Sequence, residues 1–367
     1  MRKVSLLAAS AVLAIMAASG ARADDFMDQA KARVAAAVQR AGAWDGPTTG
    51  PKAAPGKTIV YVAGDLRNGG TSGVSEGVKE AAKAIGWNLQ IIDGQGQVST
   101  RTSALNQAIA LKPDGIIVSG FDAIEQNAAL ASVKEAGIPF VGWHATIEPG
   151  PDPATGMFAN VNTRILDVAN TAADLAIVDS GGKAGVVIFG DSNYAMAIGK
   201  AKMMEAEIKK CATCEVLSLE DSPMTEASMR MPQLTTSLLQ RFGDKWTYSL
   251  AVNDLYYDFM GPSLASAGKD GDGTPKNISA GDGSESAFQR IRSKQYQLAT
   301  VPEPLHQQGW QIIDELNRAL AKEPWSGYVS GIHIVTADNI AFDGGPNNVF
   351  DPDNGYRDVY KKIWGVQ

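Results

Sequence analysis

Short apolar runs alternate with longer helical patterns over most of this chain. The first unit shows the pattern clearly. A β-rich apolar run at residues 58–63 is followed by a polar loop, and then by a stretch in which the small residues Gly73, Gly77 and Ala81 recur at every fourth position. A strand, a loop and a helix in this order open a β-α-β unit. The same alternation continues to about residue 301.

The pattern predicts ten strands and eight helices in alternation. The strands are expected at 58–63, 88–92, 115–118, 140–142, 157–159, 184–189, 215–219, 248–252, 277–280 and 297–301. The helices are expected at 73–85, 100–111, 124–135, 165–178, 195–210, 229–242, 256–267 and 284–294. Strands that alternate with helices of this length form parallel sheets. We therefore predict an α/β fold with two Rossmann-like, doubly wound parallel-sheet lobes.

The first residues have the features of a secretory signal peptide. Two cations, Arg2 and Lys3, precede an apolar run at 4–18, and an A-x-A site ending at Ala23 is followed by acidic residues. The apolar run is too short to span a bilayer comfortably. We expect residues 1–23 to be removed by cleavage after Ala23 and the mature protein to be exported and soluble.

The mature N-terminus is expected to be an accessory segment. Apolar residues at helical spacing over 24–40 are followed by a Gly- and Pro-rich stretch at 42–56 that carries Trp44. We predict a helix and a strap that pack outside the main body at residues 24–56.

Net charge limits the classes of partner. Cleavage removes three cations and lowers the formal charge from −7 to −10. Such an acidic protein is a poor candidate for binding nucleic acid or an anionic membrane.

The two cysteines, Cys211 and Cys214, are separated by two residues. In an oxidising compartment this spacing favours a small structural disulfide. A thioredoxin-like redox site is the alternative, but the preceding strand and aromatic residue are missing. A metal site would need two more ligands nearby.

The usual sequence motifs of catalysis and metal binding are missing. The three histidines are far apart, and there is no phosphate-binding G-x-x-x-x-G-K-[ST] loop, G-x-S-x-G elbow or dinucleotide-binding G-x-G-x-x-G. Acidic turns at 270–272 and 351–355 lack the closing Glu of a calcium loop. We expect no cofactor, no metal and no enzymatic activity.

Polar and aromatic side chains instead cluster where predicted strands end, which is the edge at which parallel sheets bind ligands. A set of amides, carboxylates and a few aromatic rings suits a polyhydroxylated ligand. Helix capping is the alternative role for each acidic residue taken alone. The candidates are Asp65, Arg67, Asn68, Phe121, Asp122, Trp143, His144, Tyr194, Lys200, Asn253, Asp282 and Glu303.

With these residues placed, the chain resembles the periplasmic sugar-binding proteins of ABC transporters, in particular the ribose-binding-like, type I group. The resemblance covers about residues 58–340. Besides the export signal and Asn68, it rests on the runs 112–117, 136–141, 253–254, 281–283 and 299–304.

The resemblance implies two lobes joined by three crossings, near 160–161, 303–304 and 334–335, that close on a sugar. It assigns 57–160 plus 304–334 to the N-terminal lobe, and 161–303 plus 335–367 to the C-terminal lobe and tail. It also implies a monomer in the periplasm that delivers its sugar to a permease with its ATPase, and a chemoreceptor as a further partner in some members.

Residue by residue, Asn68 matches the first-loop Asn of the family, Asn253 the second-lobe Asn and Asp282 the G-D-G aspartate. Glu303 stands where ribose-binding members carry Gln.

Departures from the family pattern disfavour ribose itself. Gly70 and Thr71 replace the usual aromatic pair, so stacking would have to come from Phe121, Trp143 or Tyr194. His144-Ala145 replaces an Asp-Arg pair, and Lys200 replaces an Arg. We expect a different sugar or an open-chain polyol.

Two other functions fit the same residues. A sensory module would present a small molecule to a membrane signalling receptor through the same closed form. A secreted enzyme would use Asp282 or Glu303 as a base, but an activated nucleophile or metal set is missing.

Overall fold

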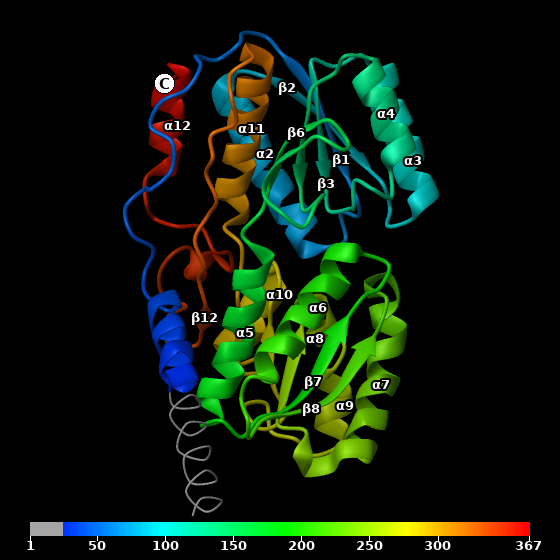
Figure 1. Cartoon of the computed structure of the whole chain (residues 1–367), viewed down its shortest axis with the longest axis vertical. Helices are drawn as coiled ribbons and strands as arrows, with labels where there is room; N and C mark the ends of the chain where they lie inside the picture. The colour runs from blue at the N-terminus through cyan, green and yellow to red at the C-terminus, as the bar shows by residue number, and fades with distance from the viewer. Residues whose placement is uncertain (1–24) are drawn as a thin grey trace, which may run out of the picture.

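The computed structural model describes residues 25–367, which form two α/β lobes, one above the other in Figure 1. The predicted signal peptide lies outside the described residues. Within them, no helix combines the length and apolar character needed to cross a bilayer.

The first lobe is built on a six-stranded sheet in the order β2-β1-β3-β4-β6-β5. All neighbours are parallel except β5 and β6. Consecutive residues of β1 point to opposite faces. Ile59 and Tyr61 therefore join one core with the helices α2 (Gly69–Ile85) and α11 (Leu305–Ala321). Val60 and Val62 join another core with α3 (Val98–Ala110) and α4 (Asn127–Glu135). The strands are β1 (Thr58–Ala63), β2 (Asn88–Asp93), β3 (Gly115–Ser119), β4 (Phe140–Trp143), β5 (Gly150–Asp152) and β6 (Met157–Val161).

The second lobe repeats this plan with the order β12-β11-β10-β9-β7-β8, in which only the β11 and β12 pair is antiparallel. The predicted fold of two doubly wound lobes is confirmed. The strands are β7 (Gly185–Gly190), β8 (Glu215–Asp221), β9 (Tyr248–Ala251), β10 (Lys276–Ser279), β11 (Ala299–Thr300) and β12 (Val335–Thr336).

Helices cover both faces of each sheet. The α-helices are α2 (Gly69–Ile85), α3 (Val98–Ala110), α4 (Asn127–Glu135), α5 (Ile165–Asp179), α6 (Ala195–Ile208), α7 (Ala227–Phe242), α8 (Leu255–Asp258), α9 (Gly261–Ser266), α10 (Glu285–Ser293), α11 (Leu305–Ala321) and α12 (Tyr356–Trp364). Single 3-10 turns occur at Met224–Glu226, Gly243–Lys245 and Gly345–Asn347.

There are three differences from the expected elements, and the first two have local causes. Helix α2 starts at Gly69 because the side chain of Asn68 accepts hydrogen bonds from the N–H groups of Gly70 and Thr71. The helix expected at 256–267 is broken into α8 and α9, and Pro262 occupies the first turn of α9. Helix α11 was not predicted, although its apolar residues Ile312, Ile313 and Leu316 recur at helical spacing.

The N-terminal segment ties the two lobes together. Its helix, at residues 25–37, packs on the second lobe, and the strap that follows runs upward to the first lobe (Figure 1). There the ring of Trp44 lies 4.9 Å from that of Tyr328 and 5.3 Å from that of Tyr360. The N–H of Ala53 donates to the carbonyl of Trp364 at 3.0 Å.

The C-terminal tail also touches both lobes. Val335, Ile340 and Phe350 pack with α10 of the second lobe. Helix α12 packs instead in the core of the first lobe with α2 and α11. The sequence analysis grouped 335–367 with the C-terminal lobe and tail, and in the structure this segment contributes to both lobes.

The chain therefore passes between the lobes three times in the central region, between β6 and α5, between β11 and α11, and between α11 and β12. The strap and the tail add two further connections outside this hinge.

Candidate ligand-binding cleft

The carboxyl ends of the strands in both sheets face a cleft of about 220 Å³ between the lobes. Ten of the twelve predicted site residues line this cleft. The two that do not are Phe121, which is 1% exposed in the core of the first lobe, and Glu303, which lies behind His144.

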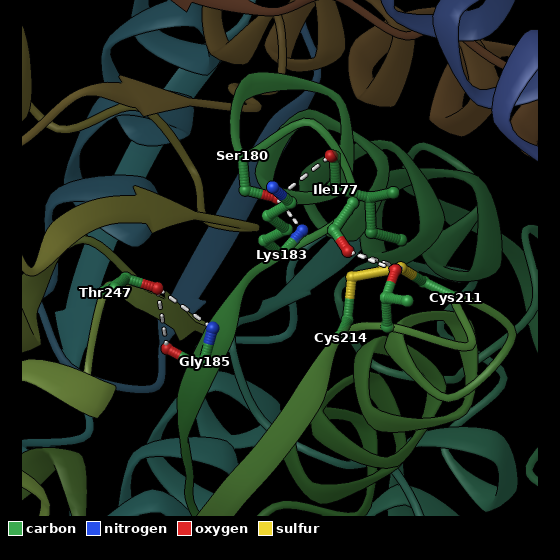
Figure 2. The surroundings of a disulfide bond; sticks show 9 residues. Ile177, Ser180, Lys183, Gly185, Cys211, Cys214 and Thr247 are labelled. Carbon is green, nitrogen blue, oxygen red and sulfur yellow. Dashed lines mark hydrogen bonds between the residues drawn. A yellow bond between two sulfur atoms is a disulfide. The ribbon is translucent and has the colours of Figure 1, made fainter.

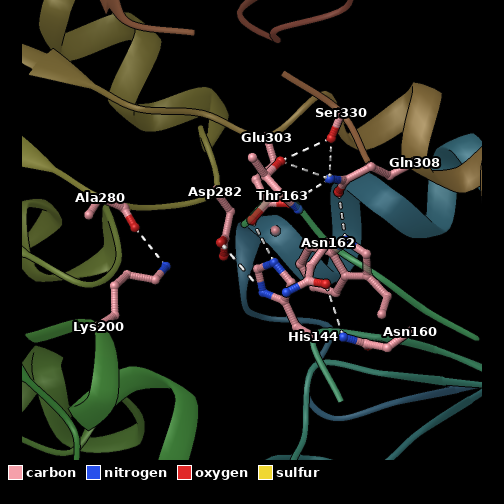
Figure 3. A network of polar contacts seen from close by, with 12 residues as sticks. His144, Asn160, Asn162, Thr163, Lys200, Ala280, Asp282, Glu303, Gln308 and Ser330 are labelled. Carbon is pink, nitrogen blue, oxygen red and sulfur yellow. Dashed lines mark hydrogen bonds and ion pairs between the residues drawn. The ribbon is translucent and has the colours of Figure 1, made fainter. Parts of the chain in front are cut away.

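His144 is the hub of the polar contacts at the hinge side of the cleft (Figure 3). Its Nε2 lies 2.7 Å from Oε1 of Glu303, and its Nδ1 lies 3.9 Å from Oδ1 of Asp282. The imidazole stacks on the indole of Trp143, with ring centroids 3.9 Å apart and planes within 4°. One side chain of the first lobe thus faces a carboxylate of the hinge and a carboxylate of the second lobe.

Glu303 is held by donors on both carboxylate oxygens. The N–H of Thr163 donates to its Oε2 at 3.0 Å, and the amide nitrogen of Gln308 donates to the same oxygen at 2.5 Å. Burial by itself raises the pKa of this carboxyl, but the attraction of His144 and these hydrogen bonds outweigh it and lower the pKa to about 2. Glu303 is therefore ionised and serves to orient His144.

His144, Asp282 and Glu303 lie close enough together to be considered as the ligands of a metal ion. One ligand atom of each side chain lies within 4.8 Å of those of the other two, but His144 turns a different ring nitrogen toward each carboxylate, Nε2 toward Glu303 and Nδ1 toward Asp282. Their arrangement fits a hydrogen-bonded bridge better than a metal centre.

Asp282, Asn253 and Lys200 form the floor of the cleft on the side of the second lobe. Asn253 donates to Oδ2 of Asp282 at 2.8 Å. The ammonium of Lys200 donates to the carbonyls of Ala280 and Val252, at 2.7 and 3.2 Å. Burial raises the pKa of Asp282, while His144 and Lys200 oppose the shift.

The loop after β1 contributes less than its sequence suggests. The side-chain oxygen of Asn68 caps α2, so only its NH₂ group is left to meet a ligand. Asp65 and Arg67 bind each other, with Nε of Arg67 2.9 Å from Oδ1 of Asp65, and Arg67 is largely exposed. Asn68 is therefore the N-cap of α2, and Asp65 and Arg67 form a pair at the rim.

Two contacts bridge the lobes across the cleft. Oδ2 of Asp122 accepts a hydrogen bond from the backbone N–H of Ala195 at 2.6 Å. Arg101, which is 2% exposed, donates to the hydroxyl of Tyr194 and lies 5.1 Å from the centre of its ring. The sequence analysis missed Arg101, although an Arg among the apolar positions of a helix was a usable signal.

Apolar residues of the cleft were also missed. They follow strands of the second lobe, where polar and aromatic residues were taken as the candidates. These residues are Met196, Ala197, Met224, Val252, Leu255 and Phe259.

Comparisons with known proteins agree with this architecture. The family model described as "Periplasmic binding protein domain" matches residues 59–324, and the chain belongs to that family. Members of the family are solute-binding proteins of ABC transporters and not enzymes. The alternative of a secreted enzyme with Asp282 or Glu303 as a base is therefore not retained.

Three solved structures illustrate the similarity. An ABC transporter solute-binding protein of Agrobacterium vitis bound with α-D-tagatopyranose is 16% identical, with a TM-score of 0.71, over 80% of this chain and 99% of that one. The arabinose-transporter component of Shewanella sp. ANA-3, bound to L-arabinofuranose, is 16% identical, with a TM-score of 0.66 over 83% and 95%. A second A. vitis solute-binding protein, with bound allitol, is 17% identical, with a TM-score of 0.66 over 77% and 96%. At these identities the structural similarity shows the fold alone. Comparison with curated protein sequences finds no match.

Proposed function

We propose that this protein is a periplasmic receptor that captures a neutral sugar or polyol between its lobes and delivers it to the permease of an ABC transporter. The observation that carries the proposal is the cleft itself. It is enclosed by both lobes, and hydrogen-bonding groups from each converge at its hinge side. Ligand sites of this family lie between lobes that close by a hinge motion.

The charges around the cleft favour a neutral ligand. Asp65 is paired with Arg67 at the rim, and the carboxylates of Glu303 and Asp282 face His144 and Lys200 deeper in the cleft. A strongly charged ligand would leave one of these groups without its partner, which is costly away from water. Hydroxyl groups can both donate to Asp282 and accept from Lys200 and Asn253.

The size of the cleft favours a small ligand. Its volume of about 220 Å³ lies below the roughly 300–1,000 Å³ of pockets for drug-sized molecules. A monosaccharide or a short polyol suits this space better than an oligosaccharide. The sugars and the polyol bound by similar proteins, among them tagatose, arabinose and allitol, are of this size class.

Binding can be tested with the mature protein after unfolding and refolding, which removes any ligand carried from the cells. Thermal unfolding is measured with pentoses, hexoses, deoxysugars, polyols and charged metabolites. A ligand at 100 times its dissociation constant adds about 2.7 kcal/mol of stability. We expect a neutral hydroxylated compound to give this shift. A shift only with charged metabolites would contradict the proposal.

Variants separate the cleft from other sites. Asp282→Ala should abolish the shift, because it leaves the donor of Asn253 without its partner and removes an acceptor from the cleft floor. Asp244→Ala, at a fully exposed aspartate of the second lobe, is the matched control and should keep the shift.

A further inference from the structure

The two walls of the cleft differ in polarity. The first lobe contributes mainly polar groups, including Asn68, Thr71, Asp122 and His144. The second lobe contributes Lys200, Asn253 and Asp282 near the hinge, the hydroxyl-bearing residues Tyr194, Thr225 and Ser228, and a group of apolar side chains. That group, the apolar wall, consists of Met196, Ala197, Met224, Val252, Leu255 and Phe259.

The apolar wall occupies positions from which side chains reach a ligand. Met196 and Ala197 are in the first turn of α6, directly after the loop that follows β7. Met224 follows β8, and Val252 and Leu255 follow β9. All of them lie beyond the carboxyl ends of parallel strands, where α/β folds bind their ligands. They line the cleft as well as packing on the lobe beneath.

Flat aromatic faces, which usually cover the C–H groups of a sugar ring, are already occupied at this site. The indole of Trp143 is stacked on His144, and the ring of Tyr194 lies under the guanidinium of Arg101. Gly70 and Thr71, in the first turn of α2, add no aromatic ring. The cleft therefore offers a ligand aliphatic and thioether groups, with Phe259 as an additional ring.

An aliphatic wall in a water-filled cleft gains free energy only when carbon atoms of a ligand cover it. A hydroxyl placed against it would lose its hydrogen bonds to water without a partner. The polar groups at the hinge have the opposite requirement, since Asp282 and Lys200 need hydrogen-bonding partners. The two requirements are met together by a ligand with hydroxyls along one edge and hydrocarbon along the other.

We propose that the cleft selects a small deoxy or methyl-bearing sugar or polyol. Its hydroxyls would face His144, Asn253 and Asp282, and its hydrocarbon edge would face Met196, Val252 and Leu255. This inference rests on the proposed function and narrows the substrate class of the same site.

Matched pairs of compounds that differ by one hydroxyl test the inference. Calorimetric titration compares L-rhamnose with L-mannose, L-fucose with L-galactose, and butane-1,2,3-triol with erythritol, using refolded wild-type protein. In any pair that binds, we expect the member lacking the hydroxyl to bind about 10 to 100 times more tightly, as is typical for a small apolar contact surface. Tighter or equal binding of the fully hydroxylated member in each pair that binds would overturn the inference while leaving the sugar receptor intact.

Variants of the apolar wall give a second readout. Leu255→Asn and Met196→Gln supply hydrogen-bonding groups and should narrow or reverse the preference within a pair. Met229→Gln is the control, because Met229 is 75% exposed on α7 and does not line the cleft, so the preference should remain. An unchanged preference in both wall variants would also overturn the inference. If no neutral hydroxylated compound binds, the proposed function fails, and the inference fails with it.

Discussion

The carboxylate of Asp122 in the first lobe accepts a hydrogen bond of 2.6 Å from the N–H of Ala195, the first residue of α6 in the second lobe. Helix α6 has no side-chain cap from its own N-cap residue, Tyr194. Asp122 therefore caps a helix of the opposite lobe. Burial raises the pKa of Asp122, while the N–H groups of Ala195 and Met196 oppose this shift. The contact joins the two lobes, and we expect it to be lost when they open.

Asp122→Ala should therefore weaken closure even in the absence of ligand. An N-cap is worth about 0.5–2 kcal/mol, so ligand affinity should fall by a factor of roughly 2 to 30. Small-angle scattering of the ligand-free variant should show a larger radius than that of wild type. Asp122→Asn keeps an acceptor oxygen, so its radius should lie between those of wild type and Asp122→Ala. An unchanged radius in Asp122→Ala would assign Asp122 to ligand contact alone.

The pKa shifts on either side of His144 predict the acid stability of the protein. The pKa of Glu303 in the folded state, about 2, lies below its ordinary value of 4.5. Ionised Glu303 thus stabilises the fold at and above pH 4.5, and this contribution is lost as the pH falls toward 2. The raised pKa of Asp282 acts in the opposite direction, because folding then favours its protonated form.

Glu303→Gln should remove the part of the acid-induced loss that comes from Glu303, on the order of 2 to 3 kcal/mol. The measurement is the free energy of unfolding by urea at several pH values across this window. Glu76→Gln, at an exposed position of α2, serves as the control. The assignment of the hinge carboxylate would be wrong if the variant and wild type lost stability in parallel.

The N-terminal helix supplies the counter-ion of a carboxylate buried in the second lobe. Nε and a terminal nitrogen of Arg33 lie 2.6 and 3.0 Å from the two oxygens of Asp174, which is fully buried. Burial raises the pKa of Asp174, and Arg33 opposes that shift. The accessory helix is in this sense part of the lobe on which it packs.

Arg33→Ala should lower the free energy of unfolding by about 2–3 kcal/mol, because it leaves a buried carboxylate without its partner. Half-exposure of Arg33 keeps the loss at the lower end of the range for buried pairs. Lys31→Ala removes an exposed pair with Asp28 and should cost no more than about 1 kcal/mol. Chemical denaturation of both variants measures the difference, and equal losses would refute the role of Arg33.

The disulfide between Cys211 and Cys214 lies next to the turn at 180–183, beyond the C-terminal end of α6 (Figure 2). Its loop is short, so chain entropy predicts a stabilisation of about 2 kcal/mol. The N-terminal end of the same helix lines the cleft, about 20 Å away along the helix axis.

Reduction of the disulfide, or the double change Cys211→Ala and Cys214→Ala, should therefore lower thermal stability without altering ligand affinity. Unfolding and titration are measured on the oxidised, reduced and double-variant proteins. The redox alternative would be favoured over a structural disulfide by one result. Reduction would change the ligand affinity of the wild-type protein, and the same treatment would leave the affinity of the double variant unchanged.

The predictions from the sequence succeeded where local pattern decides structure. Alternating apolar runs and helical patterns identified the two doubly wound lobes, because burial on both faces of a parallel sheet leaves that trace in any sequence. Polar residues such as His144, Asn253 and Asp282 were found because the carboxyl ends of parallel strands share one edge. The relation to periplasmic binding proteins followed from residues in local runs.

Helix α11 and the apolar wall were both missed in the sequence. Both break the rule that core positions are apolar and ligand positions polar. Gln308 and Asp314 are buried in α11 because partners from distant segments satisfy their hydrogen bonds. Met196 lines the cleft although it reads as an ordinary helix residue.

Only the tertiary structure decided the contacts between distant residues. Arg33 meets Asp174 across 141 positions, and Asp122 meets Ala195 across 73. The tertiary structure likewise decides that α12 packs on the first lobe. It also places His144 between Glu303 and Asp282. By itself the sequence determined the alternation of strands and helices, the two lobes and the strand ends at which the cleft lies, since these depend on residues close together along the chain. The pairing of charges and the closure of the lobes depend on groups that meet only when the whole chain has folded.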